Sequence, residues 1–213
     1  MNKKILSTLI IVSTFTVIPV LAKPNLMIQI EWIIATVSLL VLFLTQPALN
    51  FNEVKKKKSA DKYSILLILL MCGISTIVPI IEWAYNKNGE HVDFFYLITG
   101  STLIIVGLVI RISAINVLGN HFTATVQITK KHQLITKSIY KYIRHPSYLG
   151  AFIYFVGISL LLESWLGLII TIISMMIAYY VRISIEEATL LDHFGDEYKE
   201  YQRKTKKMFP YIW

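Results

Sequence analysis

Two short stretches of the chain hold the residue types best suited to chemistry, and the first is Tyr140 to Gly150, YKYIRHPSYLG. It combines Arg144, His145, a proline and three tyrosines directly before an apolar run. Pro146 suits the first turn of a helix, because the N–H that proline lacks is one that this turn leaves unpaired. Free backbone N–H groups at such a helix start attract anions. The stretch therefore predicts a polar binding site, and the alternative is a simple membrane-interface belt of basic and aromatic residues.

The second stretch is RISIEEATLLDHFG, which begins at Arg182. Arg182 and Glu186 are four residues apart and therefore lie on one face of a helix. Glu187 points about 100° away from that face and is the weaker candidate. An intrahelical salt bridge at the membrane interface is the structural alternative for the pair. We interpret Arg182 and Glu186 as candidate site residues.

A long polar segment, Gly119 to Arg144, connects two apolar runs and contains no apolar stretch of its own that could span a membrane. A loop of this length in a compact protein is usually functional or disordered, and its aromatic and β-branched content argues against disorder. Gln127, His132 and Tyr140 are its most chemically useful members, with solvated loop side chains as the alternative.

The composition restricts the class of protein that carries these residues. Hydrophobic residues make up 55% of the chain, charged residues make up 16%, and the mean hydropathy is +0.59, which excludes an ordinary soluble protein. The single cysteine, Cys72, lies in an apolar run, so we expect neither a disulfide framework nor a metal site. The net charge is +8, and the basic residues lie beside the hydrophobic runs. This placement favours attraction to anionic lipid over binding to nucleic acid.

Six segments are apolar enough to be membrane spans, which need about 20 residues each. They are Ile5 to Leu21, Ile28 to Leu44, Tyr63 to Tyr85, Phe94 to Leu118, Ser147 to Leu162 and Trp165 to Ile185. The first also resembles a secretory signal, and its cleavage would leave five. With the N-terminus in the cytosol, every lysine and arginine except Lys23 and Lys87 falls on the cytosolic side, as the positive-inside rule requires. We predict an all-α, polytopic membrane protein.

Ionisable residues fall at the ends of these spans rather than at their centres. Glu31, Glu82 and Glu163 lie near the outer ends, whereas Arg111, Arg182, Glu186 and Glu187 lie at the inner ends. A transporter would place such groups near the bilayer midplane, where its substrate is held. The pattern predicts a site that opens to the cytosol.

Two features concern the last spans and the C-terminal segment. Gly150 and Gly157 lie two turns apart on one helix face and would allow close helix contact. Beyond Glu187, a stripe of Leu190, Phe194, Tyr198 and Tyr201 indicates an amphipathic helix on the inner leaflet.

Taken together, these stretches resemble the isoprenylcysteine carboxyl methyltransferase family of membrane enzymes. The resemblance covers Leu118 to Pro210, where RHPSYLG, and then EE followed by FGDEYKEY, occur in the family's order and spacing. One departure is Ser138 and Ile139 before Tyr140, where the family often has Gly, commonly followed by Pro. We expect generic spans in residues 1–93 and a methyltransferase core in 94–213, divided into a loop (119–146), a hairpin (147–185) and a C-terminal interfacial helix (186–213).

The resemblance implies S-adenosylmethionine as methyl donor, bound under a lid made by the cytosolic loop and the C-terminal segment. The residues that match the family's cofactor contacts are Gln127, His132, Gln133, Leu134, Ile135, Tyr140, His145, Pro146, Ser147, Tyr148 and Glu186. Glu186 matches the acid that faces the methionine part of the cofactor, and Arg182 matches the substrate-facing arginine. Since the chain has no GxGxxG loop, the membrane domain itself is expected to hold the donor.

The implied reaction is methyl transfer to an isoprenylcysteine-like carboxylate, on a lipophilic small molecule or a lipidated partner, with membrane lipid as the surroundings. Such a carboxylate is ionised at neutral pH because its reference pKa is about 4, so no general base is needed. The protein must orient the acceptor and exclude water, and Arg182 suits orientation because a guanidinium can hold a carboxylate through two N–H groups. The alternatives are a phospholipid N-methyltransferase or small-thiol S-methyltransferase, a sterol-type reductase, and a transporter or structural membrane protein without enzyme activity. The reductase would carry an Arg-Asp pair where this chain has Glu186 and Glu187.

Overall fold

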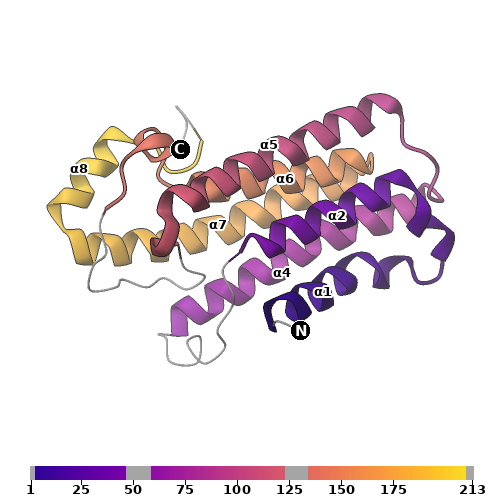
Figure 1. Cartoon of the computed structure of the whole chain (residues 1–213), viewed down its shortest axis with the longest axis horizontal. Coiled ribbons are helices and arrows are strands. Elements are labelled where there is room, and N and C mark those ends of the chain that lie inside the picture. Colours follow the sequence, from indigo (N-terminus) through magenta and orange to yellow (C-terminus); the bar gives the residue numbers. More distant parts are fainter. Residues whose placement is uncertain (1–2, 47–58, 123–133, 210–213) are drawn as a thin grey trace.

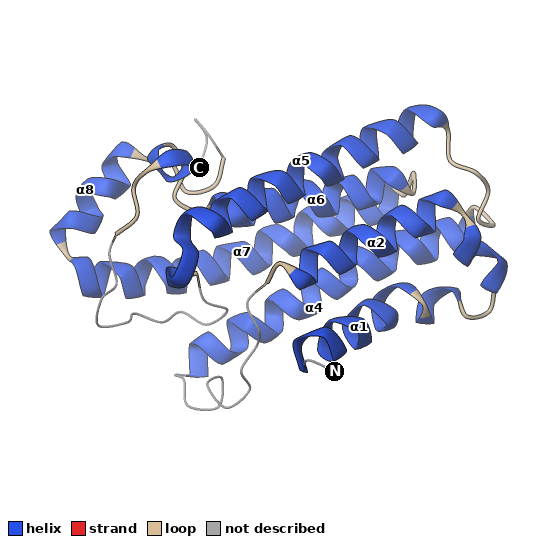
Figure 2. Ribbon diagram, in the orientation of Figure 1, coloured by secondary structure: helices blue, strands red, loops and turns tan. Residues whose placement is uncertain are grey.

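The computed structural model describes residues 3–46, 59–122 and 134–209 of the 213-residue chain. Within these ranges the chain is built of helices and connecting turns, and its one extended pairing is an isolated bridge between Ile143 and Lys206 (Figure 2). The prediction of an all-α fold is confirmed.

The helices follow the predicted spans closely. The longer ones are α1 (Lys3–Thr16), α2 (Ile30–Leu44), α4 (Ser59–Ile81), α5 (Phe94–Leu118), α6 (Pro146–Leu161), α7 (Trp165–Phe194) and α8 (Asp196–Lys204). Short helical turns connect them: η1 (Ile18–Val20), η2 (Pro24–Ile28), η3 (Glu82–Asn86), η4 (Gly119–His121) and η5 (Ser138–Lys141). All six predicted spans thus correspond to an apolar helix.

Three of these helical segments are long and apolar enough to cross a membrane: Tyr63–Asn86, Phe94–Leu118 and Trp165–Phe194. The segments Lys4–Val20, Ile30–Leu44 and Pro146–Leu161 are apolar but shorter. Large apolar side chains such as Ile98, Ile105 and Val109 point outward from α5, as expected of a helix surrounded by lipid.

The helices lie lengthwise beside one another and leave two distinct ends (Figure 1). One end carries α8, η5, the start of α6 and the last turns of α7, and we call it the α8 end. The opposite end carries η1, η2, η3 and the turn between α6 and α7, and we call it the distal end.

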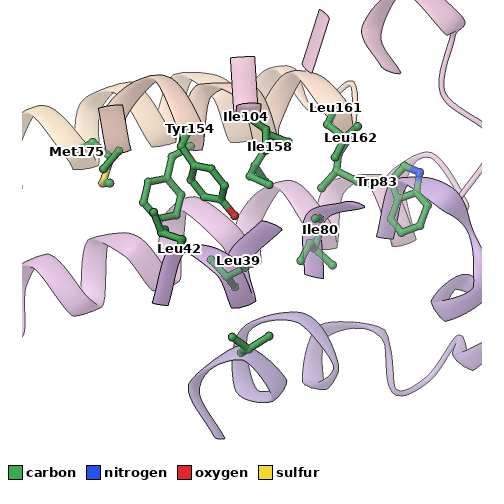
Figure 3. Close-up of a cluster of buried hydrophobic side chains, with 14 of the residues drawn as sticks. Leu39, Leu42, Ile80, Trp83, Ile104, Tyr154, Ile158, Leu161, Leu162 and Met175 are labelled. Carbon is green, nitrogen blue, oxygen red and sulfur yellow. The ribbon is translucent and has the colours of Figure 1, made fainter. Parts of the chain in front are cut away.

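The core joins the N-terminal helices to α6 and α7 (Figure 3). Tyr154 and Ile158 of α6 are fully buried in one cluster with Leu39 of α2, Ile80 of α4 and Met175 of α7. The Tyr154 hydroxyl is also 3.1 Å from the Ser38 hydroxyl of α2. The first helices are therefore packed into the same body as the predicted methyltransferase core.

Glycines set the closest helix contact, between α5 and α6. A Cβ atom added to Gly107 of α5 would lie 2.6 Å from the Gly150 carbonyl oxygen, and one added to Gly150 would lie 2.6 Å from the Arg111 nitrogen. Close backbone approach through small residues is how membrane helices gain packing energy. The predicted packing role of Gly150 and Gly157 is confirmed, and the partner helix is α5 rather than α7.

The C-terminal region differs from the expected division. The boundary expected between residues 185 and 186 lies inside α7, which continues to Phe194 and ends where Gly195 takes a left-handed φ of 56°. Tyr198 and Tyr201 of α8 are 1% and 8% exposed, so they pack against the protein. The interpretation that these two tyrosines lie on the leaflet was therefore wrong.

Candidate active site

The start of α6 is held in place by the segment that follows α8. The backbone N–H of Arg144 donates to the Lys206 carbonyl at 2.8 Å, and that of His145 donates to the Lys207 carbonyl at 2.9 Å. Pro146 takes the first helical position, as its sequence context predicted. The C-terminal segment thereby fixes the backbone from which the RHPSY side chains project.

A buried ion pair strengthens this junction. Arg144 Nε donates to Glu187 Oε1 at 2.8 Å, and the two side chains are 7% and 10% exposed. Arg144 Nη1 also donates to the Thr205 carbonyl at 2.5 Å. Sequence reasoning ranked Glu187 as the weaker acid and missed this pair, because a separation of 43 residues gives no local signal. The tandem Glu186-Glu187 was the one available sign.

His145 lies between the two acids. Its side chain is 3% exposed, Nε2 is 3.3 Å from Glu187 Oε1, and Nδ1 is 4.0 Å from Glu186 Oε2. Its ring is also 5.8 Å from the Tyr148 ring, measured between centroids. His145 therefore connects the structural acid, Glu187, to the predicted site acid, Glu186.

Tyr148 joins the two predicted catalytic residues. Its hydroxyl donates to Glu186 Oε2 at 2.8 Å and accepts from Arg182 Nε at 3.3 Å. Arg182 is 4% exposed, and its Nη1 donates to Ser64 Oγ of α4 at 2.9 Å. The Glu186 side chain is 30% exposed and so remains accessible. We call Arg144, His145, Tyr148, Arg182, Glu186 and Glu187 the carboxylate cluster.

Tyr140 connects the segment before α6 to α5 and α8. Its hydroxyl donates to the Ala114 carbonyl at 3.3 Å, and its own carbonyl accepts from the Tyr201 hydroxyl at 2.7 Å. Burial raises the pKa of both Tyr140 and Tyr201, so both hydroxyls stay protonated donors at neutral pH. Two residues earlier, Ser138 has a φ of 56°. It therefore takes the left-handed conformation that glycine adopts more easily.

Of the remaining predicted cofactor contacts, some lie within the described residues and some lie outside them. Ser147 is buried in the first turn of α6, where its carbonyl accepts from Arg111 Nη1 at 2.7 Å. Leu134 and Ile135 are partly buried in the segment before η5. Gln127, His132 and Gln133 lie outside the described residues.

The cluster has two kinds of binding group side by side. A partly exposed carboxylate beside aromatic rings suits a cation, because ring faces attract positive charge; the Tyr148 and Tyr179 rings are 5.1 Å apart here. The Arg182 guanidinium suits a carboxylate. The arrangement can therefore hold a cationic group beside an anionic one.

Comparison with known proteins finds similarity to a sequence family, to a solved structure and to several curated proteins. Residues 95–197 match the sequence model of a family described as Phospholipid methyltransferase. A solved structure of the eukaryotic intramembrane Ras methyltransferase, isoprenylcysteine carboxyl methyltransferase, is similar with a TM-score of 0.62 and 26% identity. The match covers 85% of this chain and 63% of that one, so it extends beyond Leu118 to Pro210.

The curated relatives include several proteins named protein-S-isoprenylcysteine O-methyltransferase, three of which show the extent of the similarity. The Saccharomyces cerevisiae protein is 36% identical over 163 residues, which cover 76% of this chain and 66% of the relative. The Schizosaccharomyces pombe protein is 36% identical over 50% of this chain, and the match covers 46% of the relative. The chain thus spans about half to two thirds of the length of these two yeast relatives. Protein B of Arabidopsis thaliana is 33% identical over 148 residues, which cover 68% of this chain and 73% of that relative. On this similarity, the chain belongs to the protein-S-isoprenylcysteine O-methyltransferase family.

Proposed function

We propose that the chain is a membrane methyltransferase that uses S-adenosylmethionine to methylate the carboxylate of a lipophilic, isoprenylcysteine-like acceptor. The observation that carries this proposal is the Tyr148 hydroxyl, which links Glu186 to Arg182 and so sets an acid for the donor beside a cation for the acceptor. The names of the curated relatives support the same reaction.

The residues present fit a donor that carries an ammonium group and a sulfonium. Glu186 offers a partly exposed carboxylate, which the Tyr148 hydroxyl holds in one orientation. The rings of His145, Tyr148 and Tyr179 lie next to it and offer faces that attract cations. The bound donor supplies a methyl group on a positively charged sulfur, which makes that methyl reactive toward an oxygen nucleophile. In the proposal, the family-matched residues complete the donor site: Gln127, His132, Gln133, Leu134, Ile135, Tyr140, Pro146 and Ser147.

Arg182 orients the acceptor. Hydrogen bonds to Tyr148 and Ser64 fix its guanidinium, and its burial removes competing water. An acceptor carboxylate held there is already ionised at neutral pH, so the cluster contributes position rather than a general base. His145 and Glu187 keep the start of α6 and the acid Glu186 in register.

We further propose six spans with the α8 end in the cytosol. The basic residues Lys199, Arg203, Lys204, Lys206 and Lys207 all belong to the α8 end, where the positive-inside rule would place them. In this orientation the site opens to the cytosolic face. Residues 1–93 form the N-terminal spans, and residues 94–213 form the methyltransferase core.

An amine acceptor is the second candidate, because the matched family model is described as Phospholipid methyltransferase. An ammonium must lose its proton before it can attack a methyl group, so the rate would fall steeply below the pKa of the amine. A carboxylate acceptor would show no such fall at neutral pH.

Labelled donor distinguishes these candidates. Membranes that contain the protein are incubated with methyl-labelled S-adenosylmethionine, and the lipid-soluble product is treated with base. We expect base-labile label, as from an ester, and a loss of at least 100-fold on Arg182→Ala. Arg203→Ala, which removes an exposed arginine of α8, serves as the control and should keep wild-type activity. Base-stable label would favour the amine, and wild-type activity of Arg182→Ala would contradict the proposed role of Arg182.

A further inference from the structure

The helix α4 runs antiparallel to α7 and contacts it along its length (Figure 1). At the distal end, the Glu82 carboxylate, directly after α4, accepts from the backbone N–H of Gly167 at 2.9 Å and from the Ser164 hydroxyl. These bonds satisfy groups that a helix start leaves unpaired. Glu82 therefore holds the first turn of α7 against the end of α4.

A second polar link lies in the middle of the two helices. The hydroxyls of Ser75 on α4 and Ser174 on α7 are 3.1 Å apart, and Ser75 is fully buried. Seven residues separate Ser75 from Glu82, and seven separate Gly167 from Ser174. The two links thus keep one register, and α7 cannot slide along α4 without breaking both.

The third link reaches the carboxylate cluster. Ser64 is fully buried at the α8 end of α4, and its hydroxyl accepts from Arg182 Nη1 at 2.9 Å. Tyr148 of α6 accepts from a different nitrogen, Nε, of the same guanidinium at 3.3 Å. Because the guanidinium is a rigid plane, two acceptors on different nitrogens and different helices define how that plane is turned.

From these contacts we propose that Ser64 is a positioning residue for Arg182, so that α4 completes the acceptor side of the site. The inference rests on the proposed function, in which Arg182 orients the acceptor carboxylate. It goes beyond that function because it assigns an acceptor-specific task to a residue of the N-terminal spans. Tyr148 of α6 holds the guanidinium on the side of the proposed donor site, and Ser64 of α4 holds it on the other side.

Ser75 provides a matched control for this task. Both serines are fully buried on α4 and both bond to a side chain of α7, but only Ser64 bonds to the carboxylate cluster. A general packing defect should therefore affect the two alanine variants alike. A loss of guanidinium orientation should appear in the Ser64 variant alone.

The experiment compares the full-length protein with Ser64→Ala, Ser64→Cys, Ser64→Thr and Ser75→Ala in membranes. The acceptor is N-acetyl-S-farnesylcysteine, an isoprenylcysteine with a free carboxylate, and the donor site is probed by S-adenosylhomocysteine binding. We expect Ser64→Ala and Ser64→Cys to lower kcat/KM for the acceptor about tenfold, the effect of losing one hydrogen bond to a charged group. Affinity for S-adenosylhomocysteine should stay within twofold of wild type. Ser64→Thr, which keeps the hydroxyl, should recover most of the activity, and Ser75→Ala should match wild type.

The outcomes separate this inference from the proposed function. If Arg182→Ala is impaired while Ser64→Ala and Ser64→Cys behave like Ser75→Ala, the positioning role of Ser64 is overturned and the proposed function stands. The positioning role would also be overturned if the Ser64 variants lost S-adenosylhomocysteine affinity by the same factor as kcat/KM for the acceptor. The effect would then not be specific to the acceptor. If the wild-type protein forms no methyl ester, the proposed function itself fails.

Discussion

Both ends of the helix bundle contain carboxylates with hydrogen-bond partners, but the kinds of partner differ. At the distal end, Glu31 is 1% exposed and accepts from the backbone N–H of Val92 at 3.2 Å, and Glu82 accepts from that of Gly167 at 2.9 Å. At the α8 end, the described partners of the Glu186 and Glu187 carboxylates are side chains from other helices and segments.

We interpret this difference as one between acids that support the fold and acids that belong to the proposed ligand site. A carboxylate that caps backbone N–H groups is tied to the fold, since moving it would unpair a helix or a turn. A carboxylate held by tyrosine, histidine and arginine side chains belongs to a network in which a ligand can take part. The kind of partner therefore distinguishes Glu82 from Glu186, the acid that the sequence had already indicated as a candidate site residue.

The largest effect is expected at the junction that supports the carboxylate cluster. Arg144→Ala leaves the Glu187 carboxylate buried without its arginine and should destabilise the fold by about 3–5 kcal/mol. Thermal unfolding of the detergent-solubilised protein measures the loss. Arg203→Ala, which removes an exposed arginine, should leave the unfolding temperature unchanged. Equal stability of the two variants would mean that the ion pair does not support the site.

The distal end should respond in stability alone. Glu82→Ala removes the acceptor at the start of α7 and should cost about 1–2 kcal/mol, as the loss of a helix cap does. The folded fraction should still bind S-adenosylhomocysteine with wild-type affinity. Thermal unfolding and S-adenosylhomocysteine binding, measured on the same preparation, check the stability and the affinity. A tenfold loss of that affinity in Glu82→Ala would contradict the distinction between the two ends.

A smaller effect is expected where α8 contacts the loop. Tyr201→Phe removes only the hydroxyl that donates to the Tyr140 carbonyl, so it should cost about 1 kcal/mol. Tyr142→Phe is the control, because Tyr142 is 68% exposed and loss of its hydroxyl should not change the stability. If both variants unfold at the same temperature as wild type, the Tyr201 hydrogen bond does not hold α8 to the loop.

Hydropathy was sufficient to locate the six apolar helices, although α7 continues past the predicted span to Phe194. The predicted span Phe94 to Leu118 has the same bounds as α5, because Asp93 caps it and Gly119 ends it. The four-residue spacing also predicted that Arg182 and Glu186 lie on the same side of one helix, and in the structure both contact the Tyr148 hydroxyl. These features depend on local sequence, which is why the pattern alone could give them.

The long-range partners could not be predicted from the pattern. Arg144 and Glu187 are 43 residues apart, and Ser64 and Arg182 are 118 residues apart. A buried serine on an apolar helix looks like any small packing residue until its partner helix is known. The first spans were therefore described as generic, although α4 contacts the cluster directly.

The central claim is that Glu186 belongs to a ligand site while Glu82 belongs to the framework. Isothermal titration of S-adenosylhomocysteine into purified wild-type protein, Glu186→Ala and Glu82→Ala tests it most directly. The account predicts binding to the wild type, at least tenfold weaker binding to Glu186→Ala, and wild-type affinity for folded Glu82→Ala. Equal affinity of Glu186→Ala and wild type would contradict it.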